Sequence, residues 1–127
     1  MLEINDLHKF YGTDKTKTEV LRGINCVIPK GELCILLGPS GSGKSTLLNI
    51  IGGIEQGDEG GIFFEGRDLL KMKKGELEDY RRSTLGFIFQ FYNLVPNLTV
   101  KENIEVGGFL SKNPLPLDDL LKTLGLW

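Results

Sequence analysis

The chain has 127 residues, of which 40% are hydrophobic and 25% are charged, as in one ordinary globular domain. Its formal net charge of -2, with basic and acidic residues interleaved, argues against direct binding of nucleic acid. The charge-free stretch 33–43 is too short to span a bilayer, and the N-terminus lacks the basic and apolar regions of a secretory signal. We therefore expect a cytosolic location.

The two cysteines indicate neither a zinc site nor a disulfide. Cys26 and Cys34 lie in two predicted strands, and there is no third or fourth Cys to complete a zinc site. A cytosolic protein is kept in a reducing environment, and Cys is among the most often buried residues. We predict that both are reduced core residues.

The first part of the chain predicts two antiparallel strands. Apolar residues between residues 2 and 11 indicate the first strand, and the polar stretch 12–18 indicates a surface loop. Residues 20–28 alternate in the manner of a second strand, which ends at the turn formed by residues 29–31.

A strand, a glycine-rich loop and a helix follow in that order. Residues 33–37 form a continuous apolar run, typical of a strand covered on both faces in a parallel sheet. Apolar residues then recur at helical spacing from Lys44 to Ile51, and two glycines after Ile51 stop the helix.

The second half predicts further short elements. Residues 60–64 indicate a strand, residues 74–82 a charged and exposed helix, and residues 85–89 another apolar strand. Thr99 with Glu102 predicts a capping box for a helix through residue 106, and residues 118–124 predict a last short helix.

The glycine-rich loop has the pattern Gly-x-x-x-x-Gly-Lys-Ser of a phosphate-binding P-loop. Glycines allow the backbone N–H groups to approach a polyphosphate, and the following helix adds its positive N-terminal end. Lys44 would bring a charge to the β and γ phosphates of a nucleotide, and Ser45 would offer a hydroxyl to Mg²⁺. The predicted nucleotide-binding residues of this segment are Gly38, Pro39, Ser40, Gly41, Ser42, Gly43, Lys44, Ser45 and Thr46.

A P-loop alone leaves the class of enzyme open, because GTPases, nucleotide kinases, helicases and transporter ATPases all use one. The chain has no Asn-Lys-x-Asp motif for reading guanine, and it shows no lid or acceptor-binding region of a small-molecule kinase. Residues outside the P-loop must decide between the classes.

The segment 36–49, which extends the P-loop through Thr46, closely resembles the Walker A region of ABC transporter ATPases. Upstream, residues 7–11 and 20–32 are similar to the family's first strands. Tyr11 then matches the aromatic residue that stacks on adenine; burial of Tyr11 in the core and stacking by Phe10 are the alternatives.

Downstream, residues 85–94 resemble the family's Q-loop, which puts Gln90 at the edge of a strand. The resemblance implies that its carboxamide binds Mg²⁺ or orients the attacking water, so Lys44 and Gln90 are the candidate catalytic residues and Ser45 and Gln90 the candidate Mg²⁺ ligands. Without this context, Gln90 would be interpreted as a surface residue.

The resemblance implies an α/β fold, namely the N-terminal portion of a P-loop NTPase of the ABC type. We expect an antiparallel β subdomain, a P-loop strand-loop-helix unit and an incomplete core sheet. Residues 1–95 would form the nucleotide-binding part and residues 96–127 the start of a helical subdomain. The segments look most like macrolide exporters, lipoprotein-release systems and antimicrobial-peptide efflux systems, and the final stretch leans towards peptide resistance.

The family pattern also contains a Leu-Ser-Gly-Gly-Gln signature, a Walker B strand, a catalytic Glu and a switch His, none of which is present here. His8 cannot be that switch residue, because it lies in the first strand. We therefore expect this truncated chain to bind nucleotide but not to hydrolyse it. An uncovered sheet edge and apolar face predict self-association.

The resemblance implies two partners, a transmembrane permease subunit and a second ATP-binding subunit in a dimer. It places the protein at the inner face of the cell membrane through the permease. The transported substrate stays open. The alternative function is that of a non-catalytic nucleotide-binding or interaction module.

Overall fold

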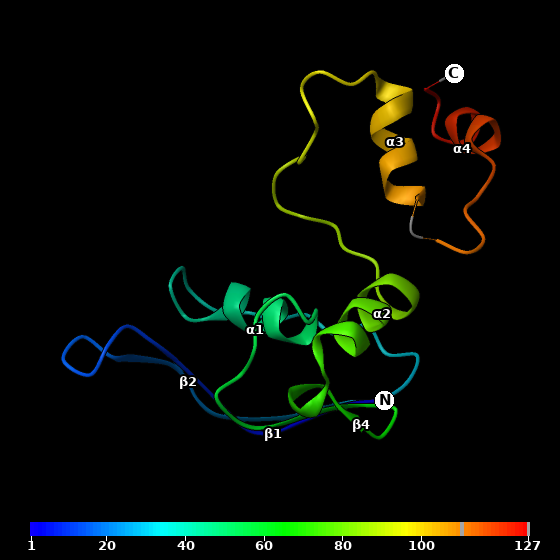
Figure 1. The fold of residues 1–127 in the computed structure, drawn as a ribbon. Helices are drawn as coiled ribbons and strands as arrows, with labels where there is room; N and C mark the ends of the chain where they lie inside the picture. Colours follow the sequence, from blue (N-terminus) through cyan, green and yellow to red (C-terminus); the bar gives the residue numbers. More distant parts are fainter. Residues whose placement is uncertain (110, 127) are drawn as a thin grey trace. The chain divides into compact units, whose positions relative to one another are not determined.

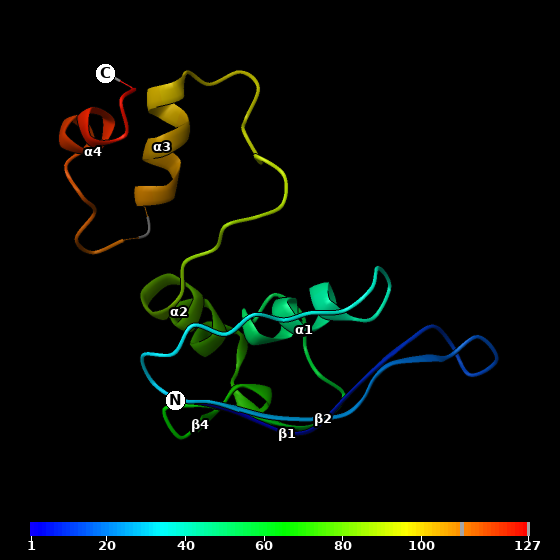
Figure 2. The same cartoon turned by 180° about the vertical axis from the view of Figure 1, so that it is seen from behind.

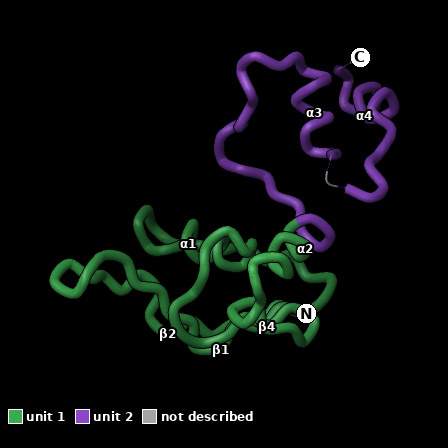
Figure 3. The backbone as a smooth tube through the Cα atoms, in the orientation of Figure 1, with its two compact units in different colours: residues 1–81 green, residues 82–127 purple. Residues whose placement is uncertain are grey.

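The structure is a computed structural model that describes residues 1–109 and 111–126. The chain divides into two compact units, Met1–Arg81 and Arg82–Trp127, drawn in green and purple in Figure 3. Each unit is described on its own.

The first unit contains a four-stranded antiparallel sheet with the strand order β2-β1-β3-β4. Its strands are β1 (Leu2–Tyr11), β2 (Thr18–Ile28), β3 (Glu59–Phe64) and the short β4 (Arg67–Asp68). Leu2 pairs with Ile28 and Tyr11 with Thr18, so β1 and β2 form a long hairpin. The predicted antiparallel pair of strands and the strand near residues 60–64 are confirmed.

A bulge in β1 determines which side chains enter the core. Ile4 and Leu7 are three residues apart and would point to opposite faces of a regular strand, yet they are only 2% and 0% exposed. The pairing with β2 is irregular between them, and Asp6 has a positive φ of 46°. An extra residue in a strand turns the following side chain over, so both apolar residues reach the same core.

Two α-helices and a 3₁₀ helix cover one side of this sheet: α1 (Lys44–Ile51), η1 (Leu69–Lys71) and α2 (Lys74–Thr84) (Figures 1 and 2). Helix α1 has the predicted bounds. The buried core comprises Ile4, Leu7, Leu21, Leu47, Ile50, Ile62, Leu69, Met72, Leu77 and Tyr80.

The helix predicted over residues 74–82 is present and most of its residues are exposed, but two of its residues are buried. Leu77 and Tyr80, three positions apart, lie on one face of α2 and are 7% and 3% exposed. The charged composition of the helix hid this narrow apolar face, which packs against the rest of the unit.

The second unit contains α3 (Val100–Gly108) and α4 (Leu117–Thr123). The predicted capping box is confirmed, because Thr99 Oγ1 accepts from the Glu102 N–H at 3.1 Å and Glu102 Oε1 accepts from the Thr99 N–H at 3.0 Å. The helix expected near the end of the chain is also present. In the described part of the chain, no helix is long and apolar enough to cross a membrane.

Two predicted strands do not form. Residues 33–37 are extended coil, in which Leu33 and Leu37 are 89% and 84% exposed, and residues 85–89 are also coil. A strand is stable only where neighbouring strands accept and donate its backbone hydrogen bonds, and no strand of the described sheet pairs with either segment. The apolar composition indicated a preference for burial, but tertiary partners decide whether a strand forms.

The prediction that both cysteines lie in the core is wrong as well. Cys26 and Cys34 are free thiols, as expected, but both are exposed. Cys26 is on β2, one of the two edge strands of the described sheet, and Cys34 is in the segment that stays unpaired. Burial of Cys34 depended on a strand that this fold does not contain.

Candidate functional site

The P-loop occupies residues 38–45 and leads directly into α1. Gly43 is the N-cap of this helix with φ of 95°, and in the described part of the chain no side chain caps it. The first turn of α1 contains no acidic residue. The N–H groups of a first helical turn have no partner within the helix and carry partial positive charge, so this end of α1 suits an anion.

The glycines of the loop have distinct roles. A Cβ on Gly38 would lie 2.7 Å from Ser42 Oγ, and one on Gly43 would lie 3.1 Å from Leu21 Cδ2. A Cβ on Gly41 would meet no atom within 4 Å, but its φ of 80° favours glycine. A side chain at position 38 would therefore displace Ser42, glycine at position 43 is favoured by its φ of 95°, and Gly41 leaves open space beside the backbone.

Lys44 folds back across the loop that precedes it. Its ammonium donates a hydrogen bond to the backbone oxygen of Gly38, which closes the loop between the two motif positions. Ser42 N donates to Pro39 O at 3.2 Å and forms the turn in between. Ser45 is exposed. The loop thus combines a glycine-rich backbone, the positive charge of Lys44 and the hydroxyl group of the exposed Ser45.

Tyr11, at the end of β1, lies beside the first turn of α1. Its hydroxyl oxygen is 3.5 Å from Thr46 Oγ1, and it donates to the carboxylate of Glu55. This bond to Glu55 is the main reason why the pKa of Tyr11 is raised. The side chain of Tyr11 is 39% exposed, so the alternative that Tyr11 is a core aromatic is wrong.

Phe10 is directed elsewhere. Its ring stacks at 6.3 Å on the ring of His8, and Lys17 Nζ lies 4.3 Å from its centroid. Successive residues of a strand point to opposite faces, so only one of the two neighbouring aromatic side chains can lie beside α1. In this fold, that residue is Tyr11.

Gln90 is in the second unit, whereas the P-loop and Tyr11 are in the first. It lies at an exposed bend and not at the edge of a strand, because the strand predicted before it does not form. The geometry around the P-loop therefore joins Tyr11, Thr46 and residues 38–45, and the function of Gln90 stays a prediction from sequence.

Glu55 was missed by the sequence analysis. It contacts Tyr11 and also Asn49 of α1, whose side-chain amide donates to Glu55 Oε1 at 3.3 Å. In the sequence, Glu55 comes shortly after two glycines, and an acidic residue in that position is typical of a surface turn. Nothing in the local pattern indicates that it meets a tyrosine 44 positions earlier.

Comparison with known proteins assigns this architecture to a family. The family model described as ABC transporter matches residues 21–127 of the chain. The chain belongs to the ABC transporter family. Within it, the chain corresponds to the N-terminal portion of the ATP-binding domain, and its P-loop is that of an ABC ATPase.

Individual relatives agree with this family assignment. The bacitracin export ATP-binding protein BceA of Halalkalibacterium halodurans is 46% identical over 90% of this chain and 45% of its own length. The lipoprotein-releasing system ATP-binding protein LolD of Geobacter metallireducens is 38% identical over 99% of this chain and 58% of its own length. These relatives lie in the subfamily that the sequence indicated.

A solved structure shares the fold. The ABC cassette MJ0796, crystallised as a dimer in a post-hydrolysis state with ADP and Pi, is 34% identical and superposes with a TM-score of 0.83 over 96% of this chain and 53% of that chain. The chain thus spans about half the length of each of these three relatives. The expected fold class is confirmed, except for the P-loop strand.

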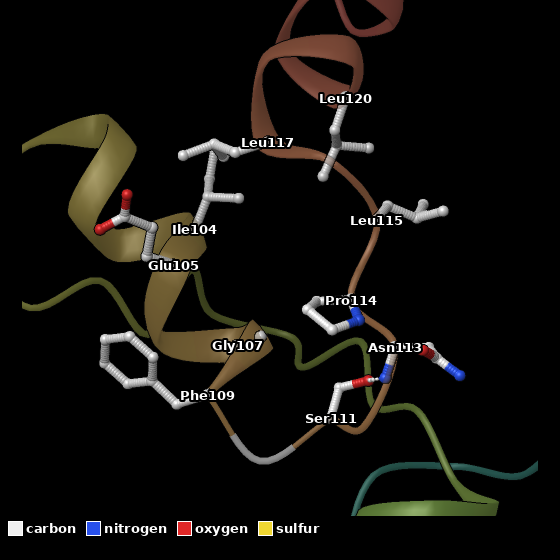
Figure 4. Close-up of a pocket in the computed structure, with 11 residues that line it drawn as sticks. Ile104, Glu105, Gly107, Phe109, Ser111, Asn113, Pro114, Leu115, Leu117 and Leu120 are labelled. Carbon is white, nitrogen blue, oxygen red and sulfur yellow. Dashed lines mark hydrogen bonds between the residues drawn. The ribbon is translucent and has the colours of Figure 1, made fainter.

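The second unit of the ABC ATPase chain contains a hollow of about 530 Å³ between α3, α4 and the segment that joins them (Figure 4). Ile104, Leu117 and Leu120 point into it, and Glu105 is the one charged residue among the described residues of its lining. An apolar lining of this kind does not suit a triphosphate. The hollow is therefore not a candidate nucleotide site.

Proposed function

We propose that this chain is the nucleotide-binding part of the ATP-binding subunit of an ABC exporter, and that it binds ATP with Mg²⁺ at residues 38–46. The observation that carries the proposal is the N-terminus of α1, where an uncapped first turn, free of acidic residues, follows a glycine loop closed by Lys44. Such a helix end attracts a phosphate group.

The residues around the loop fit a polyphosphate. The glycines at positions 38 and 43 leave little room for a side chain, and the open space at Gly41 lets a ligand approach the main chain. Backbone N–H groups of the loop would hold the phosphate oxygens, and Lys44 would exchange its bond to Gly38 for a phosphate. These groups are all donors, which is the chemistry that an anion requires.

Tyr11 would hold the adenine ring. Its hydroxyl lies beside Thr46, which belongs to the helical turn that directly follows the phosphate-binding loop. One nucleotide could therefore contact both the ring of Tyr11 and the loop. Stacking of an aromatic side chain on a base contributes about 1–3 kcal/mol and discriminates little between bases. We expect ATP to be preferred to free triphosphate and GTP to bind comparably.

Bound Mg²⁺ would neutralise phosphate charge during phosphoryl transfer. Ser45 offers an exposed hydroxyl at the first turn of α1, and the resemblance to the family's Q-loop implies Gln90 as the second ligand. Both are oxygen ligands of the kind that Mg²⁺ prefers, and each would act through its side-chain oxygen.

Coupling to transport is proposed for the whole protein. The loop from Phe91 to Asn97 would transmit the state of the nucleotide site to a permease partner at the cytoplasmic face of the membrane. A second ATP-binding subunit would complete the site, and the related cassette MJ0796 is known as a dimer. The sequence holds neither the signature motif nor the catalytic carboxylate, so we propose that these 127 residues bind ATP without turning it over.

Titration of the purified chain with ATP, with and without Mg²⁺, tests the proposal. We expect saturable binding that Lys44→Ala weakens at least tenfold, while Lys101→Ala, an exposed lysine on α3, leaves it unchanged. A phosphate-release assay on the same samples should show no steady turnover. Absence of ATP binding to the wild-type chain would refute the proposal, and turnover abolished by Lys44→Ala would refute its second part.

A further inference from the structure

We propose that Glu55 is a positioning residue that fixes the ring of Tyr11 beside the first turn of α1 and so determines how firmly the base of ATP is held. The inference rests on the proposed binding of ATP. Glu55 itself need not touch the nucleotide, because it acts on the side chain that stacks on the base.

The carboxylate of Glu55 has a separate partner for each of its oxygens. Oε2 accepts the hydroxyl hydrogen of Tyr11, and Oε1 accepts from the side-chain amide of Asn49 at 3.3 Å. Asn49 belongs to α1, and Tyr11 ends β1. The carboxylate therefore ties the end of a strand to the helix that starts at the P-loop.

The backbone around Glu55 is held by the same helix. Ile54 N and Glu55 N both donate to the backbone oxygen of Asn49, at 2.9 and 3.2 Å. These bonds satisfy a carbonyl near the C-terminal end of α1 and fix the turn that carries Glu55. The backbone and the side chain of Asn49 thus both restrain Glu55, so its carboxylate is held in place for the hydrogen bond with Tyr11.

A neighbouring contact supports the same orientation of the ring. Lys9 Nζ lies 5.2 Å from the centroid of Tyr11 and donates to the backbone oxygen of Gln56 at 2.8 Å. The segment 55–56 therefore restrains both the hydroxyl and the environment of the ring. A side chain that is already ordered loses less entropy when a ligand binds.

Without Glu55, the remaining contact of the Tyr11 hydroxyl is Thr46 at 3.5 Å, which is at the limit for a hydrogen bond. The tyrosine would then sample other rotamers, and the base of ATP would stack on a less ordered side chain. The phosphate cradle depends on the backbone of residues 38–43 and should be unaffected.

Binding of ATP and of inorganic tripolyphosphate to the 127-residue chain separates these effects. We expect Glu55→Ala to weaken ATP binding by about threefold to tenfold, the loss of one hydrogen bond, with tripolyphosphate binding unchanged. Glu55→Gln keeps an acceptor oxygen and should restore most of the affinity for ATP. Glu78→Ala, an exposed acid on α2, is the matched control and should behave as wild type.

A double-mutant cycle with Tyr11→Phe tests whether the effect passes through the tyrosine. In the Tyr11→Phe background, which lacks the hydroxyl but keeps the ring, Glu55→Ala should cause no further loss of ATP affinity. An equal loss in both backgrounds, an equal loss for tripolyphosphate, or unchanged ATP binding by Glu55→Ala would each overturn the inference. A wild-type chain that binds neither ligand would instead refute the proposed function.

Discussion

Tyr80 of α2 donates its hydroxyl hydrogen to the backbone oxygen of Ile51, the last residue of α1, at 2.8 Å. Its neighbour Arg81 donates to the oxygen of Gly53 at 2.5 Å. Consecutive residues of α2 thus satisfy two carbonyl groups at the end of α1, where the helix itself supplies no donors. The P-loop helix is therefore anchored from its C-terminal end, away from the phosphate cradle.

Removal of the Tyr80 hydroxyl should destabilise this anchor. Tyr80 is 3% exposed, so in Tyr80→Phe the oxygen of Ile51 loses its donor in a place that water reaches poorly. We expect the free energy of unfolding to fall by about 1–2 kcal/mol, measured by urea denaturation. Tyr92→Phe is the control: Tyr92 is 93% exposed, and its loss should stay within about 0.5 kcal/mol. Equal stabilities of the two variants would contradict this prediction.

Gly43→Ala should damage the fold and the phosphate cradle together. The new methyl group would sit 3.1 Å from Leu21 Cδ2 at a φ of 95°, where alanine is strained. We expect a loss of about 1–3 kcal/mol in unfolding free energy, with weaker ATP binding. Gly75→Ala in α2 is the counterpart, since its Cβ would meet no atom within 4 Å, and it should stabilise the chain by about 0.5–1 kcal/mol. A Gly43→Ala variant with wild-type stability would show that the close approach is relieved without cost.

His8 should be protonated at a higher pH than an ordinary histidine. Its Nδ1 lies 2.7 Å from Glu19 and its Nε2 3.1 Å from Asp6, and the hydrogen bond to Glu19 is the main reason why the pKa of His8 is raised. Arg22 on β2 and Glu59 on β3 are the charged residues opposite His8 in the sheet. Since His8 is the single histidine, its ring protons can be followed by NMR, and a titration at or below pH 6.5 would contradict the prediction.

The sign of the resulting stability effect follows from linkage. A pKa that is higher in the folded state than in the unfolded state contributes stability below the unfolded value of 6.5, and this contribution disappears as pH rises through the folded pKa. The stability difference between wild type and His8→Gln should therefore be largest below pH 6.5 and shrink above it. A difference that grows with pH would have the wrong sign.

The unpaired apolar segments should cause the isolated chain to self-associate. Ile88 and Tyr92 of the second unit are among its most exposed apolar residues, and an extended apolar segment with free backbone groups can pair with another copy. We expect light scattering to show concentration-dependent association that Ile88→Lys reduces. Ile54→Lys, at a half-exposed turn residue after α1, should reduce it less. A monomeric wild-type chain at high concentration would refute the prediction.

Local signals in the sequence correctly predicted much of the fold. The helix from Lys44 to Ile51, the hairpin of β1 and β2 and the capping box of Thr99 and Glu102 depend on neighbouring residues or on a single turn, so the sequence contains their causes. The strands expected at residues 33–37 and 85–89 depend on distant partners, and there the sequence-based prediction was wrong.

The amino-acid sequence by itself determined that this protein carries a P-loop, because glycine, lysine and serine at fixed spacing are a local requirement for binding phosphate, and the segments around the loop indicated the ABC type by their resemblance to that family. Only the tertiary structure decided that Tyr11, and not Phe10, lies beside α1, and that Glu55 and Asn49 hold it there. The physical reason is that the end of a strand and the turn after a helix bring together residues far apart in the chain. Such contacts depend on packing, which no short sequence pattern encodes.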